Sequence, residues 1–126
     1  MATITRRGQA PIPHEMTSTT FDVPGYYVGQ SLGLVRGIVV RSRSVFGNIG
    51  AGVQMIFGGN ITIYTSMCEQ ARENAYEIML EQARNIGANA VIGVRYDATE
   101  IMRGVTEVLC YGTAVVVEEA PPPDHV

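Results

Sequence analysis

The stretch TSMCEQARENAYEIMLEQARNIG (Thr65–Gly87) decides the fold, because it predicts one long amphipathic helix. Apolar or small residues recur at three- and four-residue spacing, at positions 68, 71, 75, 78, 79, 83 and 86. Ser66 and Glu69 have the spacing of a capping box, and Gly87 suits the left-handed turn that follows a helix. Most glutamates fall on the other side, forming an acidic ridge that faces water or meets arginines of a neighbouring subunit.

Alternating β-branched segments on both sides of this helix predict strands. We expect one at Met16–Val23, and one long or two short strands at 26–45, with a break near Gly29–Gly33. Two more follow at 88–102 and Val105–Glu119, joined by a turn at Arg103-Gly104. With a short helix before the long one, the order is β-β-(α)-α-β-β. Strands paired around a helical centre predict an α+β fold with an antiparallel sheet.

The domain plan follows from composition. A chain of 126 residues fits one domain, which we assign to residues 16–119. Residues 1–15 carry prolines and no periodicity and are predicted to be a mobile arm. Residues 120–126 form a proline-rich tail.

The glycine-rich segment GNIGAGVQMIFGG (Gly47–Gly59) has three readings. It lacks the lysine of a P-loop, and its G-x-x-G-x-G spacing is the reverse of a dinucleotide fingerprint. The chain is uncharged from Ser44 to Cys68, yet too polar and glycine-rich for a typical membrane span. We therefore predict a short, weak helix at Val45–Phe57, held by tertiary or subunit contacts and stopped by Gly58-Gly59.

Charge and cysteine content narrow the classes of function. A net charge of −3 argues against a nucleic-acid partner. Two cysteines make no disulfide framework, so reduced core thiols in a cytoplasmic protein are expected. The domain proper holds no histidine to activate a cysteine or serine nucleophile, which predicts that the protein is not an enzyme. No secretory signal and no membrane partner are expected.

Several segments together resemble the YbjQ family of small bacterial proteins. They are GANAVIGVRYD (Gly87–Asp97), YGTAVV (Tyr111–Val116), Ala71-Arg72, Ala75, Thr19-Thr20, Gly58-Gly59 and Tyr64. The resemblance spans roughly Met16 to Val117. It implies an α+β subunit that assembles into a ring-shaped homopentamer, with no established enzymatic activity and a heavy-metal-binding label. The short helix before Gly58 departs from the family, because here it is neutral and glycine-rich.

Two kinds of site are candidates. An anionic small molecule could bind in a cleft between subunits, lined by Arg36, Arg41, Arg43, Tyr64 and Arg95; otherwise these residues hold subunits together or face solvent. A soft metal could bind Cys68 or Cys110 if the oligomer gathers one thiol per subunit at an axis. A four-ligand site within one subunit is not expected, because His14 and His125 lie in the termini. The sequence names no cofactor.

Overall fold

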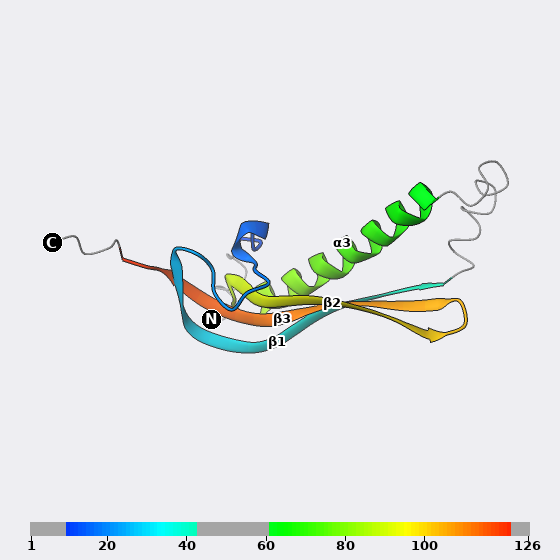
Figure 1. Cartoon of the computed structure of the whole chain (residues 1–126). Helices are drawn as coiled ribbons and strands as arrows, with labels where there is room; N and C mark the ends of the chain where they lie inside the picture. The colour runs from blue at the N-terminus through cyan, green and yellow to red at the C-terminus, as the bar shows by residue number, and fades with distance from the viewer. Residues whose placement is uncertain (1–9, 43–60, 122–126) are drawn as a thin grey trace.

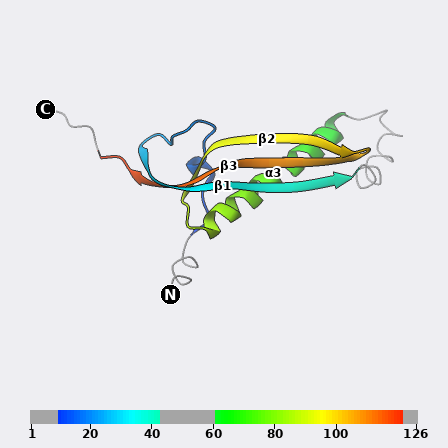
Figure 2. The same ribbon diagram turned by 90° about the horizontal axis from the view of Figure 1, so that it is seen from below.

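The computed structural model describes residues 10–42 and 61–121, and for residues 61–65 only the backbone. Along the chain come a short 3-10 helix (His14–Met16), β1 (Tyr26–Ser42), α3 (Ile61–Asn85), β2 (Ala90–Met102) and β3 (Val105–Glu119). The strands form one antiparallel sheet in the order β1-β3-β2, and α3 crosses one of its faces (Figures 1 and 2). The predicted α+β class is confirmed. The predicted helix at Val45–Phe57 lies outside the described residues.

The predicted strand at Met16–Val23 was wrong. Within this segment, Thr17 makes one isolated parallel bridge to Val91, and bends and turns follow. Its hydroxyls bond locally instead: Thr17 Oγ1 donates to the His14 carbonyl at 2.7 Å, and Thr20 Oγ1 donates to Asp22 Oδ1 at 3.1 Å. Such side-chain bonds compete with strand pairing, so the β-branched composition was misleading here.

Residues 10–25 form what we call the N-terminal strap, which wraps around the outer edge of β2 (Figure 2). Ile12 is 5% exposed and belongs to the core beneath α3, although it falls in the stretch predicted to be a mobile arm. The strap then bonds to β2: Ser18 N donates to Val91 O at 3.0 Å, and Gly93 N to Thr20 O at 2.7 Å. Val23 finally packs on the opposite face of the sheet.

Helix α3 confirms the main prediction but begins earlier. It starts at Ile61, so Ser66 lies inside the helix and the predicted capping box was wrong. Its end is as predicted. Gly87 has φ +98°, its N–H donates to Arg84 O, and Ala88 N donates to Ala83 O at 3.0 Å. These paired bonds are a Schellman motif, which satisfies the last carbonyls of the helix.

A glycine sets how closely α3 approaches β1. A Cβ atom at Gly37 would overlap the Ala75 carbonyl oxygen, so the helix lies directly on the strand backbone. Beside it, Arg36 N donates to Gln82 Oε1 at 2.7 Å at the outer edge of β1.

The segment predicted to form one long or two short strands forms the single strand β1. The predicted break near Gly29–Gly33 corresponds to two register shifts in the pairing with β3, one between Val28 and Gln30 and one between Ser31 and Gly33.

The two ends of the sheet differ in how they are covered. At the base end, α3 covers one face, and Val23 with Met16 packs on the other over Ala90, Ile92, Val115 and Val117. At the hairpin end, the predicted turn at Arg103-Gly104 is confirmed, and Gly104 has φ +76°. Here the face opposite α3, which we call the open face, exposes Leu34, Ile38 and Val40.

Candidate functional site

The arginines predicted on β1 lie on opposite faces of the sheet, because side chains alternate along a strand. Arg36 lies on the open face, between the exposed Leu34 and Ile38. Arg41 shares its face with the buried Val35 and Val39 under α3 and is itself half-buried. Arg43 and the side chain of Tyr64 lie outside what the structure describes. The sequence analysis placed Arg36 and Arg41 in one candidate site, whereas the sheet puts them on opposite faces.

A different row of side chains crosses the open face. Arg36 pairs with Tyr111 of β3, and Tyr111 pairs in turn with Arg95 of β2. With strands about 4.8 Å apart, the two arginine Cα atoms lie about 10 Å apart on either side of the half-buried tyrosine. We call Arg36, Tyr111 and Arg95 the arginine row. Sequence analysis did not select Tyr111, although the alternation of β3 separates it from the buried Cys110.

The two arginines of the row differ in their partners. The Arg95 guanidinium donates through Nη1 to the carbonyls of Thr19 at 2.9 Å and Val94 at 3.0 Å, which ties the strap to β2. The Arg36 side chain is exposed and makes no hydrogen bond or ion pair within the described ranges. Arg36 is therefore the group in the row with most donors available to an anion.

The two cysteines have opposite environments. Cys110 is fully buried between β3 and α3, where its thiol donates to the Met79 sulfur at 3.7 Å. Burial raises the pKa of Cys110 to about 11, so the thiol stays protonated at neutral pH. Cys68 is exposed, eleven residues before Met79 on α3 and thus roughly 16 Å away along the helix axis. One subunit does not bring the two thiols together.

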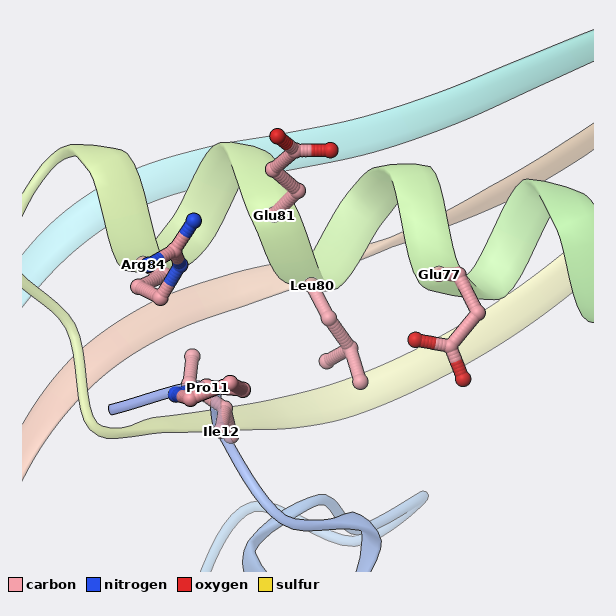
Figure 3. A pocket seen from close by; sticks show the side chains of 6 residues that line it. All are labelled: Pro11, Ile12, Glu77, Leu80, Glu81 and Arg84. Atoms are coloured by element: carbon pink, nitrogen blue, oxygen red, sulfur yellow. The ribbon is translucent and has the colours of Figure 1, made fainter. Parts of the chain in front are cut away.

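A pocket of about 220 Å³ lies between the strap and α3, lined by Pro11, Ile12, Glu77, Leu80, Glu81 and Arg84 (Figure 3). At its margin, His14 Nε2 lies 2.9 Å from Glu77 Oε2, and the His14 ring meets the edge of Tyr76. Two carboxylates against one guanidinium make this pocket a poor site for an anion. None of the arginines or cysteines predicted from the sequence lines it.

Neither a metal centre nor a membrane span is evident in residues 10–42 and 61–121. No group of three or more His, Cys, Asp or Glu side chains there is arranged to hold a metal ion. No helix in the same ranges is long and apolar enough to cross a bilayer.

The fold matches a solved structure. A crystal structure from Pediococcus pentosaceus, of a protein with unknown function in the DUF74 family, superposes with a TM-score of 0.53. The match covers 81% of this chain and 96% of that one at 14% sequence identity. At this identity the likeness extends to the fold alone.

Closer relatives identify the family. The YbjQ family model, described as "Putative heavy-metal-binding", matches residues 16–118. UPF0145 proteins from Paraburkholderia phymatum and Burkholderia thailandensis are 71% and 63% identical, covering 82% and 80% of this chain and 94% and 91% of their own. A UPF0145 protein from Burkholderia mallei is 62% identical. The chain belongs to the YbjQ (UPF0145) family, as its sequence resemblance indicated.

Proposed function

We propose that the chain acts as a non-enzymatic homo-oligomer, a pentameric ring, that binds a small anionic ligand where subunits meet. The observation that carries this proposal is the distribution of exposed large apolar side chains. They lie along both sides of the sheet and none lies on the central strand β3. Exposed apolar patches of this kind mark association surfaces.

On the β1 side, the exposed side chains are Tyr26, Tyr27, Val28, Leu34, Ile38 and Val40. Ile78 and Ile86, each 45% exposed, stand four positions before and after Gln82, whose side chain reaches the edge of β1. On the β2 side, the exposed set is Phe21, Tyr96, Ile101 and Met102. Contact between copies would bury this apolar surface, and burial stabilises an association by roughly 25 cal/mol of free energy per Å².

Sedimentation equilibrium and native mass spectrometry test the assembly. We expect a single species of five subunits that falls apart on dilution. Ile38→Asp should weaken it, because a carboxylate would replace an apolar side chain at the contact. Glu73→Ala, on the exposed surface of α3, is the matched control. A wild-type chain that remains a monomer at every concentration would refute the proposal.

The arginine row supports the anionic ligand. Arg36 and Arg95 stand on the same face at the same level of the sheet, on its two outer strands, and subunit boundaries favour ligand clefts. A guanidinium binds carboxylate or phosphate oxygens through two parallel hydrogen bonds. Phosphate, citrate and adenosine monophosphate should therefore raise the melting temperature of the assembly.

The control for this experiment is Arg103→Gln, since Arg103 is exposed at the hairpin turn and lies outside the row. Arg36→Gln should abolish the shift, whereas Arg103→Gln should keep it. Equal shifts in both variants would mean that the anions act through general screening and that the row is not a site.

A second candidate is soft-metal binding, which the exposure of Cys68 favours. The assembly would bring Cys68 thiolates of several subunits together, as no one subunit provides three ligands within its described residues. Native mass spectrometry with Cu(I) should show metal retained by the wild type and by Cys110→Ala but lost in Cys68→Ala. Retention in Cys68→Ala would exclude this site.

A further inference from the structure

Among the residues that the structure describes, the sheet has two strand edges that no further strand pairs with, one on each side. Along β1, the register shifts before Gly33 interrupt the first half, but pairing with β3 is regular from Gly33 to Ser42. No strand pairs with the outer edge of β1 within the described residues. On β2, the strap covers residues 91–94 and leaves 95–102 open. Long, regular open edges readily add another strand.

The two open stretches lie at the same height along β3. Ser42 and Met102 both pair with Val105, and Arg41 and Glu100 both pair with Thr106. β1 and β2 are each antiparallel to β3, so they run parallel to each other. A second copy placed beside the first would therefore meet it edge to edge, with β1 parallel to β2.

The two edges differ in charge: the regular part of β1 carries two arginines, and residues 95–102 of β2 carry two carboxylates and one arginine. Arg36 stands on the open face of β1 and Asp97 on the open face of β2; Arg41 and Glu100 stand on the face toward α3. Arg95 also stands on the open face of β2, level with Arg36, and its guanidinium donates to the Thr19 and Val94 carbonyls. Contact of two β1 edges would oppose arginines, and contact of two β2 edges would oppose carboxylates. The β1–β2 combination is the one that joins opposite signs. It sets Arg41 level with Glu100, and it sets Arg36 beside Arg95 and two residues along the strand from Asp97.

We propose that the outer edge of β1 in one copy pairs with residues 95–102 of β2 in the next, continuing the sheet from subunit to subunit. This inference rests on the proposed homo-oligomer and names its contact. The contact joins two different surfaces, so it is heterologous, and such contacts close into rings when the rotation allows. The exposed apolar side chains near both edges then gain neighbours on the same face of the continued sheet.

A charge-swap series tests the pairing, in buffer without phosphate or sulfate so that no anion bridges the arginines. Arg36→Glu and Asp97→Arg should each raise, by about tenfold, the protein concentration at which half of the assembly has dissociated. The double variant should return this midpoint concentration close to the wild-type value. Arg103→Glu and Glu73→Arg change the charge by the same amounts away from both edges and should leave the midpoint unchanged.

Each outcome decides between alternatives. Failure of the double variant to restore assembly overturns the β1–β2 contact. So does weakening by Arg36→Glu with no effect of Asp97→Arg, because Asp97 would then lie outside the contact. If the wild type assembles and all variants keep its midpoint, the edge pairing fails while the oligomer stands. A wild-type chain that stays monomeric would overturn both the edge pairing and the proposed oligomer.

Hydrogen exchange tests the pairing through the backbone amides, independently of the charge swaps. The Arg36 N–H points outward from β1, because it donates to Gln82. By the alternation of an edge strand, the N–H groups of Ile38 and Val40 point outward as well. We expect both amides to exchange slowly in the assembly and at least about tenfold faster after dissociation. Equal rates in the two states would overturn the pairing.

Discussion

The base end and the hairpin end of the same three strands differ in what covers them. At the base end, α3 and the strap cover the two faces, and Val91, Val115 and Ala114 are 1% exposed or less. At the hairpin end, Val40, Ile101 and Met102 are more than half exposed. β2 and β3 are also more polar toward the hairpin, where they carry Asp97, Glu100 and Glu107, yet apolar side chains stay exposed among them. The difference shows that the described part of this chain covers one end of the sheet and leaves apolar side chains exposed at the other.

The largest effect should come from truncating the covered core. Met79→Ala removes a fully buried side chain that contacts Cys110, and should lower the free energy of unfolding by about 4 kcal/mol. Ile38→Ala, at the hairpin end, should change it by less than about 0.5 kcal/mol in the dissociated subunit. Urea denaturation at low concentration measures both. Similar losses would mean that the hairpin end is also covered within one subunit.

The next effect probes where α3 lies on β1. Gly37→Val places a side chain against the Ala75 carbonyl and should destabilise the subunit by about 3 kcal/mol. Gly29→Ala is the control on the same strand, since its Cβ would stand 3.4 Å from the Glu118 carboxylate and cost less than about 0.5 kcal/mol. Thermal unfolding followed by circular dichroism compares the two. A stable Gly37→Val variant would contradict the close helix contact.

Two glycines with positive φ, one near each end of the sheet, extend the comparison of the two ends. Backbone strain depends on the local φ angle, so it should cost the same at both ends, whereas packing differs between them. Gly87 follows α3 near the base end and Gly104 lies in the hairpin turn, with φ +98° and +76°. No atom stands within 4 Å of a Cβ at Gly87, so the cost of alanine there is conformational. Gly87→Ala and Gly104→Ala should each cost about 1 kcal/mol by urea titration. A cost at one of the two glycines and none at the other would contradict a common origin in backbone strain.

The last effect concerns alkaline pH. Burial raises the pKa of Cys110 from 9.0 to about 11 and that of Tyr96 from 10.0 to about 12. The folded state therefore holds these protons more tightly than the unfolded state, and stability is lost as pH rises above about 9. The urea midpoint should fall between pH 8.5 and about 10.5, and Cys110→Ala should flatten that fall. An unchanged slope in the variant would contradict a buried thiol.

Much of the fold was predictable from local pattern. The three-and-four spacing identified α3, and Gly87 identified its end, because both signals are contained in a few residues. The start of α3 was missed, since Ser66-x-x-Glu69 has capping-box spacing inside a helix as well. Met16–Val23 was misread because threonine favours strands, while its hydroxyls also bond nearby backbone groups.

The candidate site was less predictable, because sheet geometry determines it. Arg36 and Arg41 differ by an odd number of positions, and this parity already predicts opposite faces on a regular strand. Arg95 is different. The register shift between Ile92 and Arg95 reverses the alternation of β2, and nothing in the local residues beyond Gly93 signals it. Tyr111 becomes a candidate only when its neighbours on both strands are known.

The strand order also implies a sequence of events during folding. β2 and β3 meet through the turn at Arg103-Gly104, whereas β1 joins β3 through pairs such as Ser42 with Val105, more than sixty residues apart in the chain. Closing the larger loop costs more entropy, so the hairpin is expected to form early and β1 to dock late, a difference that φ-value measurements would detect. The basic edge that we assign to subunit contact then exists only once a chain has finished folding, which keeps incomplete chains from joining one another through it.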